Sequence, residues 1–392
     1  MVRIILLGGF AAALAICGVA DASWSTGGGG NGASSALSIP PVAAPSHTIA
    51  TYPSVSLSWP AVTVGGAAVT YTVRRYSEPG VPQPVGNACT GSLPTSSCTE
   101  SAVPVGRWQY TAQAARASWI GAESARSTTV EIAAAPTSVA CLNCHTYGTT
   151  TYVNAAIATA VQLRATFAST SLATDTANLS LTDGASHTAA ASSAAPDGAG
   201  TVSFAPLDTS TLVDGAVTAA AGVTANTGDV SPTMSLALVR DTVAPSGSDV
   251  AGANGGTARQ LDNGDTLTYT FSEPVDPATV KAGWTGTATT VSAVFTNTGG
   301  GDTIAVTGTN LGSVDTHANY VKATLTCSAS TMSTSGSTVT VTFGGCAPAG
   351  SARKNAARSA FTWTPSASVT DLAGNSMSTT AVTQTGGKQV NF

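Results

Sequence analysis

The residues with the clearest chemical pattern are Cys141, Cys144 and His145, in the run Cys-Leu-Asn-Cys-His. This spacing is the attachment motif of c-type haem, in which two thioethers hold the porphyrin and the histidine binds the iron. The same two cysteines could instead form a local disulfide. The flanking sequence resembles strands rather than the helices expected around haem c, and no second axial ligand lies nearby. We therefore expect a Cys141–Cys144 disulfide and no cofactor, with haem as the alternative.

Four further cysteines form two locally spaced pairs. Cys89 and Cys98 lie on either side of a Gly-Ser-Leu-Pro-Thr-Ser turn, and Cys327 and Cys346 lie on either side of a Ser-Thr-Ser-Gly-Ser-Thr turn. A hairpin folded at each turn would place its two cysteines opposite each other, within disulfide range. The spacing therefore predicts the disulfides Cys89–Cys98 and Cys327–Cys346.

Other kinds of site are poorly supported. Asp262, Asp265, Glu273 and Asp276 could gather at one end of a sandwich and bind calcium, but they lack an EF-hand spacing. We interpret them as turn-forming and solvated acids, and expect no metal site. No nucleophile stands in a recognisable setting with a base and an orienting group. We therefore expect no enzymatic activity.

The N-terminus predicts export. Arg3 precedes an apolar stretch over residues 4–19, and Ala20-Asp21-Ala22 fits a cleavage site. We expect a signal peptide at 1–22 and a Gly/Ser-rich tether at 23–37, with an uncleaved membrane anchor as the alternative. Any membrane contact would be through this segment. Export places the remaining six cysteines where disulfides persist, and the protein is expected to be secreted or at the cell surface.

Composition excludes one class of partner and indicates the fold class. Charged residues make up 9% of the 392 residues and the net charge is −5. The one basic cluster, at 351–358, is interpreted as a solvated loop, so the chain lacks the extensive clustered cations that nucleic-acid binding needs. Short Thr- and Val-rich runs alternate apolar with polar residues between Gly- and Pro-containing turns. This pattern predicts an all-β chain of three tandem sandwiches.

The first sandwich is expected at 38–134. Trp59, Tyr71 and Tyr110 lie on an early, a following and a late strand. This arrangement resembles the core of a fibronectin type III domain. The resemblance implies that Tyr110 is a corner tyrosine, whose hydroxyl bonds back to the main chain.

A Cys-containing junction at 135–148 and a linker at 241–245 bound the second sandwich, at 149–240. Its alternating strands resemble the tandem bacterial immunoglobulin-like domains of surface proteins. The third sandwich is expected at 246–392. Its phrase Thr-Phe-Ser-Glu273-Pro-Val-Asp-Pro, with a late Asp371-Leu-Ala-Gly-Asn375, resembles immunoglobulin-like domains of surface-layer and adhesin proteins.

These resemblances imply a non-enzymatic role in adhesion, binding or surface structure, with an unidentified cell-surface, glycan or protein ligand. One alternative is a haem c redox protein. Another is a spacer or binding module of a carbohydrate-active system, for which Trp119 and Trp284 are the expected exposed aromatic contacts.

Overall fold

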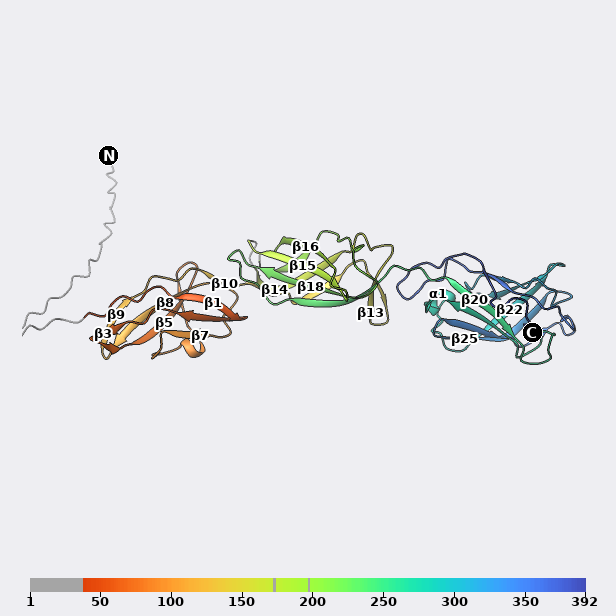
Figure 1. The fold of residues 1–392 in the computed structure, drawn as a ribbon, viewed down its shortest axis with the longest axis horizontal. Coiled ribbons are helices and arrows are strands. Elements are labelled where there is room, and N and C mark those ends of the chain that lie inside the picture. The colour runs from red at the N-terminus through yellow and green to blue at the C-terminus, as the bar shows by residue number, and fades with distance from the viewer. Residues whose placement is uncertain (1–37, 172–173, 197) are drawn as a thin grey trace, which may run out of the picture.

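The computed structural model describes residues 38–171, 174–196 and 198–392, so the expected signal peptide and tether lie outside the described residues. In the described residues regular structure is almost entirely strand, with one 3-10 turn, η1 (Asn87–Cys89), and one short helix, α1 (Pro277–Val280). Buried side chains form three separate cores. We call the segments around them the first unit (38–132), the middle unit (133–241) and the third unit (246–392). Figure 1 shows the units in a line, and the predicted all-β fold class is confirmed.

The first unit is a sandwich of two antiparallel sheets. One sheet has the order β1 (Ser46–Thr51), β2 (Ser54–Ser58), β7 (Ser97–Glu100). The other has the order β10 (Val130–Ile132), β8 (Gly106–Arg116), β5 (Thr70–Ser77), β6 (Pro82–Gln83), with β9 (Trp119–Glu123) also on β8. A small hairpin joins β3 (Thr63–Val64) to β4 (Ala67–Ala68).

The three aromatic residues expected in this core are buried, and the rings of Trp59 and Tyr71 meet edge to face at 5.4 Å. The expectation that Tyr110 is a corner tyrosine bonded to the main chain is wrong about the hydrogen-bond partner. Its hydroxyl donates to Glu100 Oε2 at 2.8 Å, not to the main chain. Glu100 is buried and paired with Arg75 at 2.6 Å, and a charged carboxylate is a stronger acceptor than a peptide carbonyl.

The middle unit pairs a three-stranded with a six-stranded sheet. The first has the order β11 (Ser138–Cys141), β14 (Leu163–Ser171), β17 (Gly198–Ser203). The second has the order β12 (His145–Tyr147), β13 (Thr150–Asn154), β19 (Met234–Asp241), β18 (Gly215–Thr224), β15 (Thr176–Asp183), β16 (Thr188–Ala194).

The expectation of a junction at 135–148 is corrected by this topology. That segment supplies β11 and β12, one strand to each sheet of the middle unit. Both strands are short, and of the four residues of β11 only Val139 is buried. A run this short gives too little alternation for a strand to be recognised.

The third unit is built on one long sheet. Its order is β20 (Gly247–Ala253), β21 (Thr266–Phe271), β26 (Thr338–Thr342), β25 (Leu325–Ser335), β22 (Thr289–Asn297), β23 (Asp302–Thr307), β24 (Ser313–Asp315), β28 (Thr362–Thr364), β29 (Val382–Thr383), with β27 (Cys346–Ala347) also on β25. The two ends of the sheet meet, because β20 contacts β28 and β29. The enclosed core is aromatic and includes Tyr269, Phe295, Trp363 and Phe392. Within the described ranges, no helix is long and apolar enough to cross a bilayer.

Candidate functional site

The best-defined polar cluster lies where the middle unit meets the third unit. The middle unit contributes the end of β13 and Asp241, the last residue of β19. The third unit contributes the loop after β21, which holds Glu273, and the loop from Asp371 to Asn375. Strand ends and turns bring these segments together, so the side chains involved are distant in the sequence.

Asn375 ties the two units together through hydrogen bonds. Its backbone N–H and its Nδ2 each donate to the Asp371 carboxylate at 2.8 Å, which fixes the loop. Its Nδ2 also donates to the Asp241 carbonyl at 3.0 Å, and its Oδ1 accepts from the Ala155 N–H at 2.9 Å. Asn154 Nδ2 adds a bond to the Ala373 carbonyl at 3.0 Å. The loop is therefore bonded directly to the middle unit.

Gly374 allows the loop to approach this closely. Its φ is +87°, a conformation that residues with a Cβ rarely adopt. A Cβ added there would lie 3.2 Å from the His145 ring and 3.3 Å from Asn154 Nδ2. His145, the histidine of the Cys-x-x-Cys-His motif, therefore packs against the third unit at this junction.

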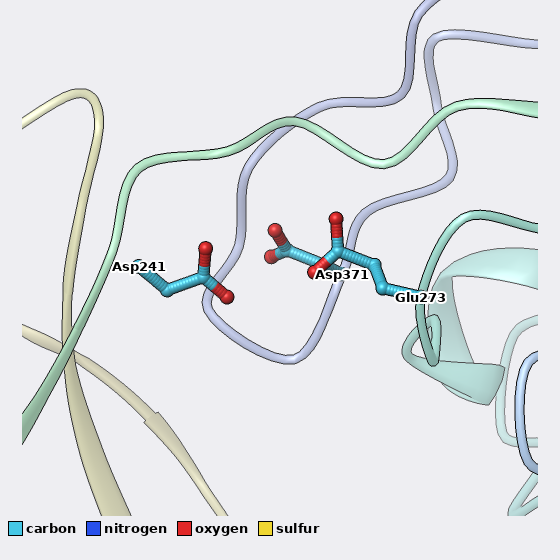
Figure 2. Close-up of side chains that lie close together, drawn as sticks. All are labelled: Asp241, Glu273 and Asp371. Atoms are coloured by element: carbon cyan, nitrogen blue, oxygen red, sulfur yellow. The ribbon is translucent and has the colours of Figure 1, made fainter. Parts of the chain in front are cut away.

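Three carboxylates converge beside this loop, as Figure 2 shows. Asp241, Glu273 and Asp371 each place an oxygen within 4.8 Å of the others. Asp371 is only 1% exposed. Burial first, and then the neighbouring negative charges, raise the pKa of Glu273 to about 7. Burial likewise raises the pKa of Asp241. These three oxygens are of the type that Ca²⁺ and Mg²⁺ take as ligands, so they are the residues that could hold a cation.

The acidic residues considered from the sequence are not brought together as a set. Asp265 accepts from the backbone N–H groups of Gly255 and Asp262 at 2.8 Å. Asp276 accepts from the Ala278 N–H at 2.9 Å and caps α1. Both act as turn and capping residues, as expected, but Asp265 is fully buried and not solvated. Of the acids considered from the sequence, only Glu273 joins the cluster. Sequence reasoning missed Asp241 and Asp371 as its partners, although Asp241 begins the predicted linker at 241–245 and Asp371 begins the phrase Asp-Leu-Ala-Gly-Asn.

The sulfur atoms of Cys141 and Cys144 are bonded to each other. In this state they cannot form the two thioethers of haem c. His145 lies in β12 opposite Tyr152, which gives this residue a place in the sheet and at the junction. The motif is thus a crosslinked turn between the first two strands of the middle unit.

The structure also contains the disulfides Cys89–Cys98 and Cys327–Cys346. Cys327 and Cys346 face each other across β25 and β27, beyond the β25–β26 hairpin, as the hairpin reasoning requires. The first pair forms differently. Cys89 ends the 3-10 turn η1 and Cys98 lies in β7, which pairs with β2, so no hairpin joins these two cysteines.

The two tryptophans that are expected to be exposed differ in their exposure to solvent. Trp119 is 55% exposed, near the turn between β8 and β9. Trp284 is 5% exposed and belongs to the core of the third unit, so the expectation of an exposed contact there is wrong. Its Nε1 donates to the Thr287 carbonyl at 2.6 Å, which satisfies the one polar group of the indole.

The contact between the first and middle units also involves buried acids. Arg107 pairs with Glu131 at 3.0 Å and donates to Thr174 of the middle unit at 2.9 Å. The Glu131 N–H donates to Asp229 of the middle unit at 3.1 Å. Burial, opposed by Arg107 and reinforced by the nearby Asp175 carboxyl, raises the pKa of Glu131. Both junctions thus combine hydrogen bonds between units with carboxyl groups held away from water.

Together these features define the class of the chain: a tandem array of disulfide-containing β-sandwiches with hydrogen-bonded, acidic junctions. No protein-family model and no curated protein matches the sequence. A comparison with solved structures matches the crystal structure of the FN1–FN3 domains of chicken CNTN1 at 11% identity, covering 88% of this chain and 99% of that chain, with a TM-score of 0.23. A superposition this poor does not establish a shared arrangement.

Proposed function

We propose that this is an exported, non-enzymatic protein in which three sandwiches form a spacer for adhesion, binding or surface structure. The observation that carries the proposal is the bonding of Asn375 to both Asp241 and Ala155. A loop tied in this way restricts the angle between the middle and third units. An extended array with fixed angles is suited to holding a binding surface at a distance.

The junction between the first and middle units supports the same role. Ala133 and Ala134 leave the last strand of the first unit and are buried in the core of the middle unit. The chain therefore passes from one sandwich to the next without an exposed flexible linker. The three disulfides and the all-β fold fit an extracellular setting.

Small-angle scattering of the purified protein tests the spacer role. The wild type should give the maximum dimension of three sandwiches in a line. Asn375→Ala removes the bonds of Asn375 to Asp241 and Ala155 and should broaden the distance distribution. Asn297→Ala is the matched control, because Asn297 bonds to Lys322 and Gly299 within the third unit. A wild type that is already flexible would contradict the proposal, and so would an Asn375→Ala variant whose scattering is identical to that of Asn297→Ala.

Localisation is tested separately. In cells that express the full chain, protease added outside should degrade the protein while the cells remain intact. N-terminal sequencing should begin near Ser23 if the signal peptide is cleaved. Protein that is protected inside the cell would contradict export, and a covalent Soret-absorbing species would favour the haem alternative.

The exposed indole of Trp119, next to the 71% exposed Ile120, favours one second candidate: a binding module of a carbohydrate-active system. Exposed aromatic rings provide the flat apolar surface on which sugars stack. A glycan array probed with the wild type and with Trp119→Ala tests this, and binding that survives the substitution excludes Trp119 as the contact.

A further inference from the structure

Strand β16 (Thr188–Ala194) ends the six-stranded sheet of the middle unit and has one strand neighbour, β15, in the described part of the chain. The two strands pair in continuous register from Thr188 to Ala194. Its sequence, Thr-Ala-Ala-Ala-Ser-Ser-Ala, contains no charge, no proline and no bulky side chain. Figure 1 places β16 at the margin of the middle unit, beside the line through the three units.

Edge strands usually carry features that prevent them from pairing with another chain: short length, a charge, proline or a bulge. Several of the other described edges have such features, and β17 (Gly198–Ser203), which has neither charge nor proline, has a register shift against β14. β12 has three residues and β10 has three. β6 contains Pro82, and β1 has an irregular register near its end. β20 contains Asp249, has a register shift and is covered by β29. β16 has none of these features over seven residues.

The free hydrogen-bonding groups of β16 can be assigned from the ladder. Asp183 N–H bonds to the His187 carbonyl, and Ala195 N–H bonds to the Asp175 carbonyl. Hydrogen-bonded pairs alternate along an antiparallel ladder, so the odd-numbered residues of β16 bond to β15. The N–H and C=O groups of Thr188, Ala190, Ser192 and Ala194 therefore point away from the sheet.

We propose that β16 pairs with β16 of a second copy of this chain. Antiparallel pairing about a two-fold axis at Ala191 places Ala190 opposite Ser192 of the other copy, and Thr188 opposite Ala194. All four outward-facing residues then fall in hydrogen-bonded pairs, which exchange up to about eight backbone bonds. Because the edge is complementary to itself, a single surface supplies both halves of the contact.

Side chains allow this register on both faces of the sheet. The inward-facing side chains are Ala189, Ala191 and Ser193. In the dimer Ala189 lies opposite Ser193 of the second copy and Ala191 lies opposite Ala191, and all of these side chains are small. With no charged side chain on the strand, pairing two copies opposes no like charges, which would otherwise be destabilising. The chain continues from β16 to β17, the edge of the facing sheet, whose sequence Gly-Ala-Gly-Thr-Val-Ser is also uncharged. The two described strands on this side of the middle unit, one in each layer, therefore carry no charged side chain.

Analytical ultracentrifugation of the purified full chain tests the proposal. The wild type should shift from monomer to a species of twice the mass as concentration rises. Ala190→Lys/Ser192→Lys places lysines directly opposite each other across the axis and should abolish the shift. Ala216→Lys/Thr218→Lys adds the same charge to exposed positions of β18, two strands from the edge, and should leave dimerisation unchanged. Circular dichroism checks that both variants are folded.

Crosslinking tests the register. In the proposed pairing, residue 191 lies opposite residue 191 of the second copy in a non-hydrogen-bonded pair. The two Cα atoms are then about 4.5 Å apart, within disulfide range. Ala191→Cys should therefore give an intermolecular disulfide on a non-reducing gel, and Ala189→Cys should not. A wild type that stays monomeric at all concentrations, a dimer that survives the edge lysines, or equal crosslinking at both positions would each overturn the proposal.

Discussion

Replacing Glu273 with glutamine should stabilise the third unit at alkaline pH and leave it unchanged in acid. Glu273 shares the second junction with Asp241 and Asp371, and its pKa in the folded protein is about 7, against an ordinary value of 4.5. Below about pH 4.5 the group is protonated in both the folded and the unfolded chain. As pH rises to 7, the unfolded chain loses this proton more readily, so stability falls, and the penalty is complete above pH 7.

The magnitude follows from the pKa difference. Each pKa unit corresponds to about 1.36 kcal/mol, which sets an upper limit of about 3 kcal/mol. Glu273 is only half-buried, and solvent screens charges at partly exposed positions. We therefore expect about 1–2 kcal/mol at pH 8. Glutamine resembles the protonated carboxyl in shape and never ionises, so the variant should lack this part of the pH dependence.

Calorimetry or denaturant unfolding of the full chain between pH 4 and 8, in chelator, measures the effect. The chelator is needed because a cation bound to the three carboxylates would favour the ionised form and reverse the sign. Glu78→Gln is the control, because it removes an acid that is 60% exposed, in the first unit. Parallel stability curves for wild type and Glu273→Gln, or a variant less stable at pH 8, would refute the reasoning.

Three further predictions about stability can be tested in the same unfolding experiments. Glu100→Ala leaves a buried guanidinium without its counter-charge and should cost about 3–5 kcal/mol in the first unit; a loss under 1 kcal/mol would contradict the buried pair. Trp284→Ala should cost about 3–5 kcal/mol, whereas Trp119→Ala should stay within about 0.5 kcal/mol; equal losses would contradict their burial. Replacing Cys327 and Cys346 with serine should cost roughly 3.3 kcal/mol by loop entropy, and an unchanged transition would show that the crosslink is dispensable.

Local patterns in the sequence predicted those features that depend on neighbouring residues. Alternation along strands identified the sandwiches, and short spacing identified the cysteine pairs. Cys89 and Cys98 show a limit of this reasoning: the pair is correct, but a 3-10 turn and the β2–β7 pairing position it instead of a hairpin. The short separation of two cysteines in the sequence indicates that their sulfurs can bond to each other. It does not determine the backbone conformation between them, because more than one conformation brings the sulfurs together.

Features that depend on distant residues could not be predicted. Asp241 and Asp371 meet because two sandwiches pack end to end, and no local period encodes that contact. Trp284 has polar and small neighbours in sequence, Gly283 and Thr285, yet the third unit folds over it. In both cases tertiary packing decides burial, and burial in turn sets the local electrostatics.

The two junctions should differ in how they respond to pH, because an acidic side chain of the first junction, Glu131, is paired with a positively charged side chain, and the three carboxylates of the second junction have no such described partner. At the first junction Arg107 pairs with Glu131 at 3.0 Å and offsets its burial. At the second, no described salt bridge joins Asp241, Glu273 or Asp371 to a basic side chain. Raising the pH from 5 to 8 in chelator should therefore increase repulsion mainly at the second junction. Small-angle scattering should show greater bending there, and Glu273→Gln should suppress the change. A rise in flexibility that is equal in the wild type and this variant would place the titrating groups elsewhere.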